Sequence, residues 1–192
     1  MASEPLPDGL PLPDGTLVEL VDDTGAAIGT APKLDAHLPP GRLHRAFSVF
    51  LLDGEGRLLL QRRADAKYHS GGLWSNTVCS HPAPGEPPAE AARRRVAEEL
   101  GIEPELLTGA GTVRYRVTDP VSGLIECEWN HLFVGRATAA CDPDPAEVAD
   151  VAAVGLDEMD GMRASARFTA WFPVVLAGAL PALGELAPGR RP

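Results

Sequence analysis

Residues 79–102, CSHPAPGEPPAEAARRRVAEELGI, constrain the fold more than any other part of this chain. A Gly/Pro turn leads into a run with helical periodicity. Proline is tolerated in the first turn of a helix, so we expect the helix to begin near Pro87 or Pro88. Gly101 is a natural residue to end it. The segment therefore predicts a short helix entered from a loop that carries Cys79 and His81.

The expected helix has an apolar face and a charged face. At about 100° per residue, Glu99 borders the apolar stripe, whereas Glu98 points away from it. Arg95 precedes Glu99 by four residues and shares its face. Carboxylates beside arginines suit Mg²⁺ held against a diphosphate, although the same pattern also describes an ordinary surface helix. The stripe itself comprises Ala89, Ala92, Val96 and Leu100.

The segment resembles the Nudix box, in which Gly, five residues, Glu and seven residues precede R-E-U-x-E-E-x-G-U (U is aliphatic). Ser80 replaces the first Gly, and Arg95 replaces the Glu that follows the Arg. That Glu is normally needed for diphosphate hydrolysis, so the resemblance implies the fold and a diphosphate ligand but not an ordinary hydrolase. The matching residues are Glu86, Arg94, Glu98, Glu99, Gly101 and Ile102.

Composition narrows the class of protein. A formal charge of −10 argues against a nucleic-acid-binding surface, which needs a basic field. The odd number of cysteines (Cys79, Cys127 and Cys141) favours a reduced cytoplasmic setting over a disulfide framework. No signal peptide and no apolar run of about 18 residues is evident. We expect a soluble cytoplasmic monomer or weak dimer that acts on a small molecule, without a nucleic-acid or membrane partner.

The chain divides into one domain and two tails. Residues 1–16 contain a tandem LPDG and are rich in proline and acid, which predicts a disordered leader. Residues 17–186 are expected to form a single domain with a Nudix-type core at about 42–176. Residues 187–192 are expected to fray.

Strands and helices mix without regular alternation. This mixture predicts an α+β fold with a mixed β-sheet between helices. Lys33–Pro40 is expected to be a loop, and Arg62–Ser80 largely irregular. From about Leu156 the chain is expected to be helical, with Ala164–Leu180 as its main part. The expected strands are Leu17–Val21, Leu43–Leu52 with a hairpin into Arg57–Gln61, Thr112–Val117 and Leu124–Val134.

Glu126 and Glu128 share one face of the last strand, about 7 Å apart at a rise of ~3.3 Å per residue. Such a pair usually marks a solvated sheet surface, and the opposite face, with Trp129 and Phe133, is the apolar one. Three histidines, His37, His44 and His81, could supply further ligands, but no local spacing indicates zinc. A site with mixed nitrogen and oxygen ligands would suit Zn²⁺ or Mn²⁺. His69 and His131 are interpreted as structural.

A second resemblance covers residues 17–180. LHRAFS (43–48), WSNTVCSHP (74–82), RYR (114–116), ECE (126–128) and the region of Trp171 resemble type I isopentenyl-diphosphate Δ-isomerases of the Nudix superfamily. These are separated polar residues in the correct order, which makes the resemblance specific. It implies an enzyme of isoprenoid biosynthesis that interconverts isopentenyl and dimethylallyl diphosphate by moving a double bond.

The resemblance also implies site residues. One Mn²⁺ or Zn²⁺ would be held by His37, His44, His81, Glu126 and Glu128. Mg²⁺ bound with the substrate diphosphate would be held by Glu99 and the main-chain carbonyl of Cys79. The diphosphate would be bound by Lys33, Arg63, Lys67 and Arg95. Catalysis would fall to Cys79 and Glu128 as the acid/base pair, Tyr115 on that carboxylate, and Trp171 facing the developing cation.

Two other functions stay open from the residues. A Nudix hydrolase of a nucleoside or other diphosphate would use Glu98 and Glu99, although Arg95 counts against it. A metal-stabilised binding or structural protein would need neither Cys79 nor Glu128 for function. The order in which Cys79 and Glu128 give and take protons stays open, as does the choice between Zn²⁺ and Mn²⁺.

Overall fold

The structure, a computed structural model, describes residues 15–186. The expected leader, apart from Gly15 and Thr16, and the expected frayed tail lie outside the described residues. The elements are β1 (Leu17–Val21), β2 (Ala27–Pro32), α1 (Lys33–His37), β3 (His44–Leu52), β4 (Leu58–Arg63), β5 (Trp74–Ser75), β6 (Val78–Ser80), α2 (Pro88–Leu100), β7 (Leu106–Thr118), β8 (Ile125–Arg136), β9 (Val148–Val154), α3 (Met159–Ser165) and α4 (Phe172–Leu186).

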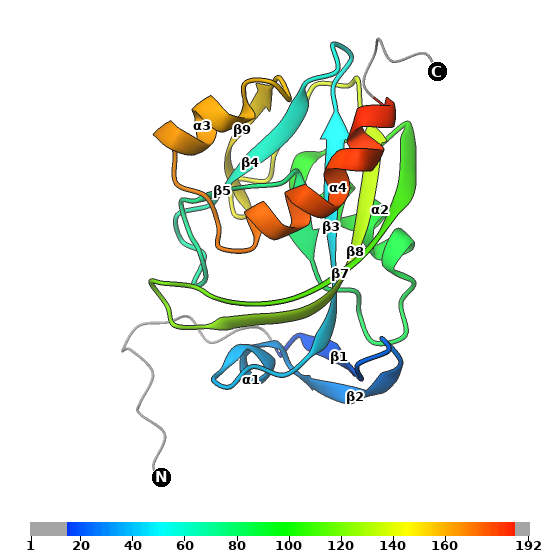
Figure 1. Ribbon diagram of the computed structural model, residues 1–192, viewed down its shortest axis with the longest axis vertical. Coiled ribbons are helices and arrows are strands. Elements are labelled where there is room, and N and C mark those ends of the chain that lie inside the picture. Colours follow the sequence, from blue (N-terminus) through cyan, green and yellow to red (C-terminus); the bar gives the residue numbers. More distant parts are fainter. Residues whose placement is uncertain (1–14, 187–192) are drawn as a thin grey trace.

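A mixed sheet forms the centre of the molecule, with β3 as its hub (Figure 1). Strand β3 pairs antiparallel with β1, β4 and β6 and parallel with β8. Strand β8 also pairs with β7, and β4 with β5 and β9. Helix α4 packs on one face of this sheet and α2 on the other, which confirms the predicted α+β sandwich in a single domain.

Successive side chains of β3 point alternately to the two faces of the sheet, and both sets are buried. Phe50 and Leu52 pack with the α4 side, while Phe47, Val49 and Leu51 pack with the α2 side. These five side chains are fully buried. A strand buried on both faces reads as a continuous apolar run, which is why FSVFLL was recognisable as a strand.

Helix α2 confirms the predicted start and end. It begins at Pro88, and Gly101 closes it in the left-handed region at φ 65°. A Cβ on Gly101 would lie 2.6 Å from the carbonyl oxygen of Asp142. Both the positive φ and this close approach therefore favour glycine at this position. The predicted stripe is wrong at Ala89, which is exposed; Ala91 is buried instead.

Several local predictions are wrong. The expected loop after Lys33 begins with α1, and β2 and β9 form strands that the sequence did not indicate. The expected C-terminal helix is broken between α3 and α4. There the backbone pairs with β5: Trp74 N donates to Arg167 O (3.0 Å), and Thr169 N donates to Trp74 O (2.9 Å). This extended pairing replaces helical hydrogen bonds and sets the position of the following Trp171.

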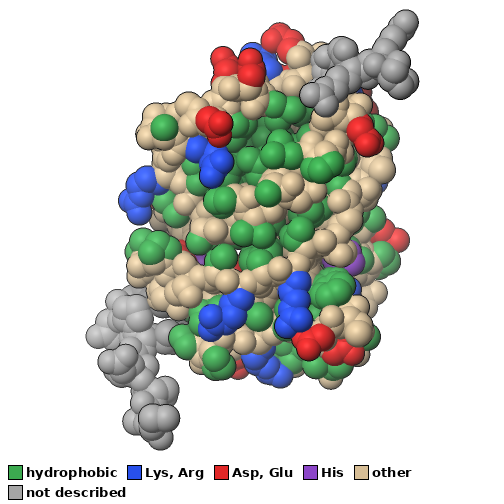
Figure 2. Space-filling model, in the orientation of Figure 1, with side chains coloured by type: hydrophobic (Ala, Val, Ile, Leu, Met, Phe, Trp, Pro, Cys, Tyr) green, Lys and Arg blue, Asp and Glu red, His purple; other side chains and the backbone are tan. Residues whose placement is uncertain are grey.

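Figure 2 shows hydrophobic side chains across the middle of one face and basic side chains lower down, over the region of β7 and β8. Arg114 and Arg116 on β7 are exposed, whereas the intervening Tyr115 is buried, as expected for alternate sides of a strand. Among the described residues, no helix combines the length and apolarity needed to span a membrane.

Candidate active site

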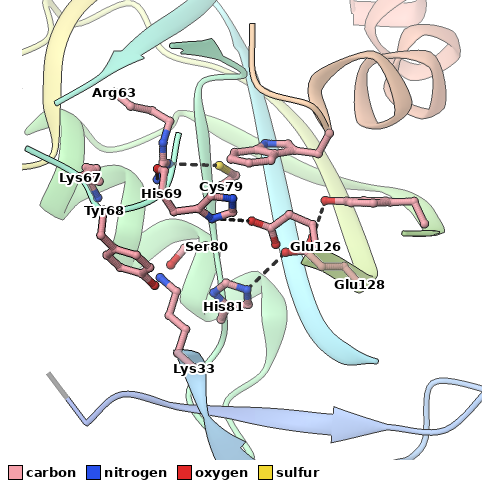
Figure 3. Close-up of a pocket in the computed structure, with 12 residues that line it drawn as sticks. Lys33, Arg63, Lys67, Tyr68, His69, Cys79, Ser80, His81, Glu126 and Glu128 are labelled. Carbon is pink, nitrogen blue, oxygen red and sulfur yellow. Dashed lines mark hydrogen bonds and ion pairs between the residues drawn. The ribbon is translucent and has the colours of Figure 1, made fainter. Parts of the chain in front are cut away.

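A cavity opens on the sheet face that carries α4, and side chains from separate elements converge on it (Figure 3). The residues that line it are Lys33, Arg63, Lys67, Tyr68, His69, Cys79, Ser80, His81, Tyr115, Glu126, Glu128 and Trp171. The predicted residues His37, His44, Arg95 and Glu99 lie outside this lining. The cavity therefore collects most, but not all, of the residues singled out from the sequence.

Strand register produces the row of groups at its floor. His44 on β3 lies opposite Glu128 on β8 in the parallel pair, and Glu128 lies opposite Tyr115 on β7 in the antiparallel pair. Side chains at facing positions of neighbouring strands lie on the same side of the sheet. Three residues distant in sequence thus form one row, and the Tyr115 hydroxyl donates to Oε2 of Glu128.

In the middle of β8 the charged side chains are more deeply buried than their neighbours on the opposite face. Glu126 and Glu128 are each 5% exposed, whereas Trp129 and His131 on the other face are only half-buried. The default interpretation of the carboxylates as a solvated surface is therefore wrong. They are tolerated inside because imidazole, phenol and amide groups surround them, including Nδ2 of Asn130, which donates to Glu128 at 2.8 Å.

Five predicted ligands form one cluster. The ligand atoms of His37, His44, His81, Glu126 and Glu128 all lie within 4.8 Å of one another. They come from α1, β3, β8 and the segment after β6, so no local spacing could have indicated the cluster. Four of the five residues are buried, and His81 is half-buried.

Hydrogen bonds to backbone carbonyls orient two of the imidazoles. Nδ1 of His37 lies 2.6 Å from Lys33 O, and Nδ1 of His44 lies 2.7 Å from Arg42 O. A carbonyl only accepts, so these nitrogens carry the protons and leave Nε2 with a lone pair. Nε2 of His37 lies 3.0 Å from Glu126 Oε2, and Nε2 of His44 lies 3.1 Å from Nε2 of His81.

Lone pairs that converge in this way fit a cation. Imidazole nitrogens and carboxylate oxygens are ligands that Zn²⁺ and Mn²⁺ accept, and hydrogen bonding of the outer nitrogen is typical of metal-bound histidine. Burial, reinforced by nearby positive groups, also lowers the pKa of two of the imidazoles. The pKa of His44 is lowered to about 4, mainly by burial and then by His37. The pKa of His81 is well below its usual value, from burial and then Lys33. The donor set suits a divalent metal.

The two carboxylates of the cluster titrate in opposite directions. Burial acts to raise the pKa of Glu126, but His37 and His69 outweigh it and hold that pKa well below its usual range. Burial and the neighbouring Glu126 charge raise the pKa of Glu128 well above its usual range. One carboxylate therefore keeps its charge while the other favours a proton, as expected for two acids that share a buried site.

The thiol and the indole lie within the same cavity. Sγ of Cys79 is 3.9 Å from Nη1 of Arg63 and 3.9 Å from Oγ of Ser75. Burial raises the pKa of this thiol to about 11, against the opposing effect of Arg63. Trp171 is 4% exposed, and the guanidinium of Arg63 lies 5.5 Å from its ring. Among residues 15–186, no group forms a hydrogen bond with its Nε1.

Basic groups occupy the other end of the cavity. Lys33 extends from α1, its Nζ lies 5.9 Å from the ring centre of Tyr68, and burial followed by Arg63 lowers its pKa. Nη2 of Arg63 donates to the carbonyl of His69 at 3.0 Å. Lys67 forms an ion pair with Glu147. The cations that the sequence singled out in this part of the chain thus gather around one space.

Arg95 and Glu99 lie next to the cavity and are linked to Lys67 through Glu147. Glu99 is 3% exposed, in contrast to the exposed Glu98, which confirms the predicted orientation of the helix. Nη2 of Arg95 lies 2.7 Å from Glu99 Oε1 and 3.3 Å from Glu147 Oε1. Although burial acts to lower the pKa of Arg95, these two carboxylates raise it.

Sequence reasoning missed several residues of this site. The sequence predicts only a structural role for His69, which lines the cavity and contacts Glu126. Tyr68 and Ser80 also line the cavity, and Glu147 links Lys67 to Arg95. The motif CSH had already marked the neighbourhood of Ser80. Lone residues in loops, such as His69 and Glu147, gave no periodic signal.

Known proteins match this chain along most of its length. A NUDIX domain matches residues 42–172. A protein of Streptomyces coelicolor named isopentenyl-diphosphate Delta-isomerase is 60% identical over 173 residues, which cover 90% of this chain and 88% of that protein. A protein of the same name from Nocardia farcinica is 47% identical over 172 residues, which cover 88% and 98% of the two chains.

Solved structures with low sequence identity share the fold. A crystal structure from Deinococcus radiodurans aligns with a TM-score of 0.67 at 18% identity and covers 85% of this chain and 98% of that one. A MutT protein from Methanosarcina mazei aligns with a TM-score of 0.56 at 20% identity, with coverage of 75% and 94%. These similarities concern the fold alone.

Proposed function

The chain belongs to the isopentenyl-diphosphate Delta-isomerase family of the Nudix superfamily, and we propose that it interconverts isopentenyl and dimethylallyl diphosphate. The observation that carries this proposal is one cavity with a thiol, a carboxylate bonded to a phenol, an indole and several cations. Arg95 supports it further, because it stands where hydrolases of the superfamily have a Glu.

The reaction requires two proton transfers at carbon. One proton is added to the terminal carbon of the double bond, and another is removed from the carbon on the far side of the tertiary centre. No atom is gained or lost overall. We assign these transfers to Cys79 and Glu128, which stand on β6 and β8, on either side of β3. Positioned acids and bases of this kind typically contribute about 10²–10⁴-fold to a rate.

The two proton transfers need one group that starts protonated and one that starts unprotonated. Burial raises the pKa of the Cys79 thiol, which favours its protonated form. Burial and Glu126 also raise the pKa of Glu128, but a metal held by this carboxylate would displace its proton and leave it able to accept one. Tyr115 donates to Glu128, and its own pKa is raised well above its usual value by burial and by Glu128. It would steady the carboxyl group and relay its proton.

Trp171 would stabilise positive charge on the substrate. A tertiary cation between the two proton transfers needs a dry pocket and a negative π face. The indole is almost fully buried and borders the same cavity as the acid/base pair. Arg63 already lies over this ring, which supports its capacity to attract a cation.

The diphosphate would be bound by Lys33, Arg63, Lys67 and Arg95, together with Mg²⁺. Glu99 and the main-chain carbonyl of Cys79 would hold this Mg²⁺, which neutralises phosphate charge when bound. The cluster of His37, His44, His81, Glu126 and Glu128 would hold one Mn²⁺ or Zn²⁺, which fixes the carboxylates. Binding the diphosphate supplies remote energy that positions the featureless five-carbon end. We also infer a cytoplasmic setting, supported by the free state of all three cysteines.

Proton NMR of isopentenyl diphosphate with the purified full chain in D₂O tests the function. With Mg²⁺ and Mn²⁺ or Zn²⁺ supplied, we expect the allylic isomer to form with deuterium incorporated, because protons are exchanged with solvent. Release of phosphate products would favour a Nudix hydrolase instead. If the metal-loaded protein neither isomerises nor hydrolyses, the enzymatic proposal is wrong and a metal-stabilised binding protein takes its place.

A further inference from the structure

His69 is a buried imidazole in the cavity wall that the proposed chemistry does not use. It is 5% exposed and lies against Trp171, with ring centres 5.5 Å apart. Its Nδ1 is 3.0 Å from Oε1 of Glu126, as the dashed line in Figure 3 marks. Its Nε2 is 3.3 Å from Oδ2 of Asp119, without hydrogen-bond geometry. The imidazole thus stands between two buried carboxylates.

Asp119 is a fixed anchor for this imidazole. It is 1% exposed and accepts hydrogen bonds from Oγ of Ser70 and from the backbone N–H groups of Val121 (2.7 Å) and Ser122 (3.1 Å). Burial acts to raise its pKa, but these hydrogen bonds outweigh burial and lower it, so Asp119 keeps its charge. A charged carboxylate held by two backbone groups cannot readily move.

The loop that carries His69 is also fixed. Ser70, the next residue, binds the same carboxylate of Asp119. A Cβ on Gly71 would lie 2.7 Å from the carbonyl oxygen of Asp65 and 2.8 Å from that of Lys67. The loop therefore closes tightly on itself and fixes the backbone that carries the imidazole.

Glu126 has a different partner on each oxygen. Oε1 faces His69, and Oε2 faces Nε2 of His37 within the cluster. A donor on Oε1 holds the carboxylate plane and leaves Oε2 to the cluster. Without that donor, the carboxylate could rotate and present either oxygen or both.

We propose that His69 is a positioning residue for the metal cluster: it transfers the fixed position of Asp119 to Glu126 and selects Oε2 as the ligand atom. This inference rests on the proposed function, in which the cluster holds a divalent metal. Partners that orient ligands in this way typically change metal affinity by about 10–100-fold. His69 touches the ligand and is not itself one of the five clustered groups.

His131 offers a matched control. The sequence predicts a structural role for this histidine too, and it lies on the opposite face of β8 from Glu126. Its Nε2 is 3.1 Å from Nη1 of Arg45. A His131→Ala variant removes an imidazole from the same strand that carries Glu126 without touching the cluster.

The test is metal affinity of the full chain, measured without substrate. Metal-free protein would be titrated with Zn²⁺ in competition with a chromophoric chelator, and with Co²⁺ while its visible absorption spectrum is recorded. We expect one tight site, an affinity about 10–100-fold weaker in His69→Ala with an altered Co²⁺ spectrum, and no change in His131→Ala. His69→Asn keeps an N–H near the place of Nδ1 and should restore most of the affinity and the spectrum.

The outcomes separate the two proposals. Tight binding that is unchanged in both His69→Ala and Asp119→Asn would overturn the positioning role and leave the metal site standing. Absence of a tight site in the unaltered chain would overturn the metal site and the positioning role together. If His69→Ala does not fold, His69→Asn is compared with Asp119→Asn. His69→Asn should bind metal more tightly than Asp119→Asn, and equal or weaker binding would contradict the inference.

Discussion

The two ends of the cavity hold charge in different ways. At the cluster end, short side chains fixed to strands and to backbone carbonyls direct lone pairs at one another. At the basic end, long flexible side chains carry positive charge, and Lys67 and Arg95 already share a carboxylate, Glu147. The first end is organised before any ligand arrives. At the second end, a ligand that binds Lys67 or Arg95 must displace their internal partner Glu147.

This difference assigns different ligands to the two ends. Imidazole nitrogens and carboxylate oxygens that converge on one point call for a cation, whereas ion-paired lysine and arginine can exchange one anion for another. A diphosphate can compete with one carboxylate for two cations because it carries more charge and more acceptor oxygens. The cavity thus joins a rigid metal-binding end to an adaptable anion-binding end, with Cys79 and Trp171 between them.

The largest effect on turnover is expected from Cys79, which lies between the two ends of the cavity. Cys79→Ala should lower the turnover number by about 10²–10⁴-fold, because it removes one of the two proton-transferring groups. Metal content and the Michaelis constant should change little. Turnover is followed by NMR in D₂O, with Cys127→Ala as the control, since Cys127 faces away from the cavity. Near-normal turnover in Cys79→Ala would remove the thiol from the mechanism.

Glu99→Gln should affect the basic end without disturbing the cluster. Loss of a carboxylate ligand should raise the Mg²⁺ concentration needed for half-maximal activity by about tenfold or more, equivalent to ~1.4 kcal/mol. The tightly bound metal, measured by elemental analysis after gel filtration, should remain. His81→Ala should do the reverse and lose that metal. Loss of tightly bound metal from Glu99→Gln would show that the two ends are not separate.

The cluster end should depend on pH through Glu128. Its raised pKa means that metal must displace a proton there, so metal affinity should increase with pH, by up to about tenfold per unit, until the pH exceeds that raised pKa. The pKa values of Glu126, His44 and His81 are lowered, so those groups release their protons at lower pH and contribute less to this slope. Chelator competition at several pH values measures the slope. An equal slope in Glu128→Gln would contradict this origin.

The smallest effect is expected at Glu147. Glu147→Gln removes the internal partner of Lys67 and Arg95, so inorganic pyrophosphate should bind about two- to fivefold more tightly in the absence of metal. Isothermal titration calorimetry measures this change. Glu86→Gln is the control, because Glu86 pairs with the outward-facing Arg94. Weaker binding in Glu147→Gln would mean that the carboxylate assists the anion instead of competing with it.

Elements with strong periodicity were predictable from the sequence. The stripe of α2 and its Gly101 end fixed the orientation of Glu99, and the apolar run of β3 identified the central strand. Short elements such as α1 and β5 were not predictable, since their conformations depend on partners elsewhere in the chain. Trp171 illustrates this: its place follows from the pairing of residues 167–169 with Trp74.

The site was predictable only where a family resemblance linked distant residues. Spacing alone left Glu126 and Glu128 as a solvated pair, because the burying partners His44 and Tyr115 are set by strand register. His69 and Asp119 escaped altogether. Their importance comes from a loop-to-loop contact across 50 residues, for which a single sequence holds no periodic signal.

Anomalous X-ray diffraction from Mn²⁺-loaded crystals, grown with and without inorganic pyrophosphate, tests the division of the cavity most directly. We expect one Mn²⁺ peak among His37, His44, His81, Glu126 and Glu128 in both crystals. A second peak should appear beside Glu99 only when pyrophosphate is bound. A cluster without Mn²⁺, or a peak beside Glu99 that is equally strong without pyrophosphate, would contradict it.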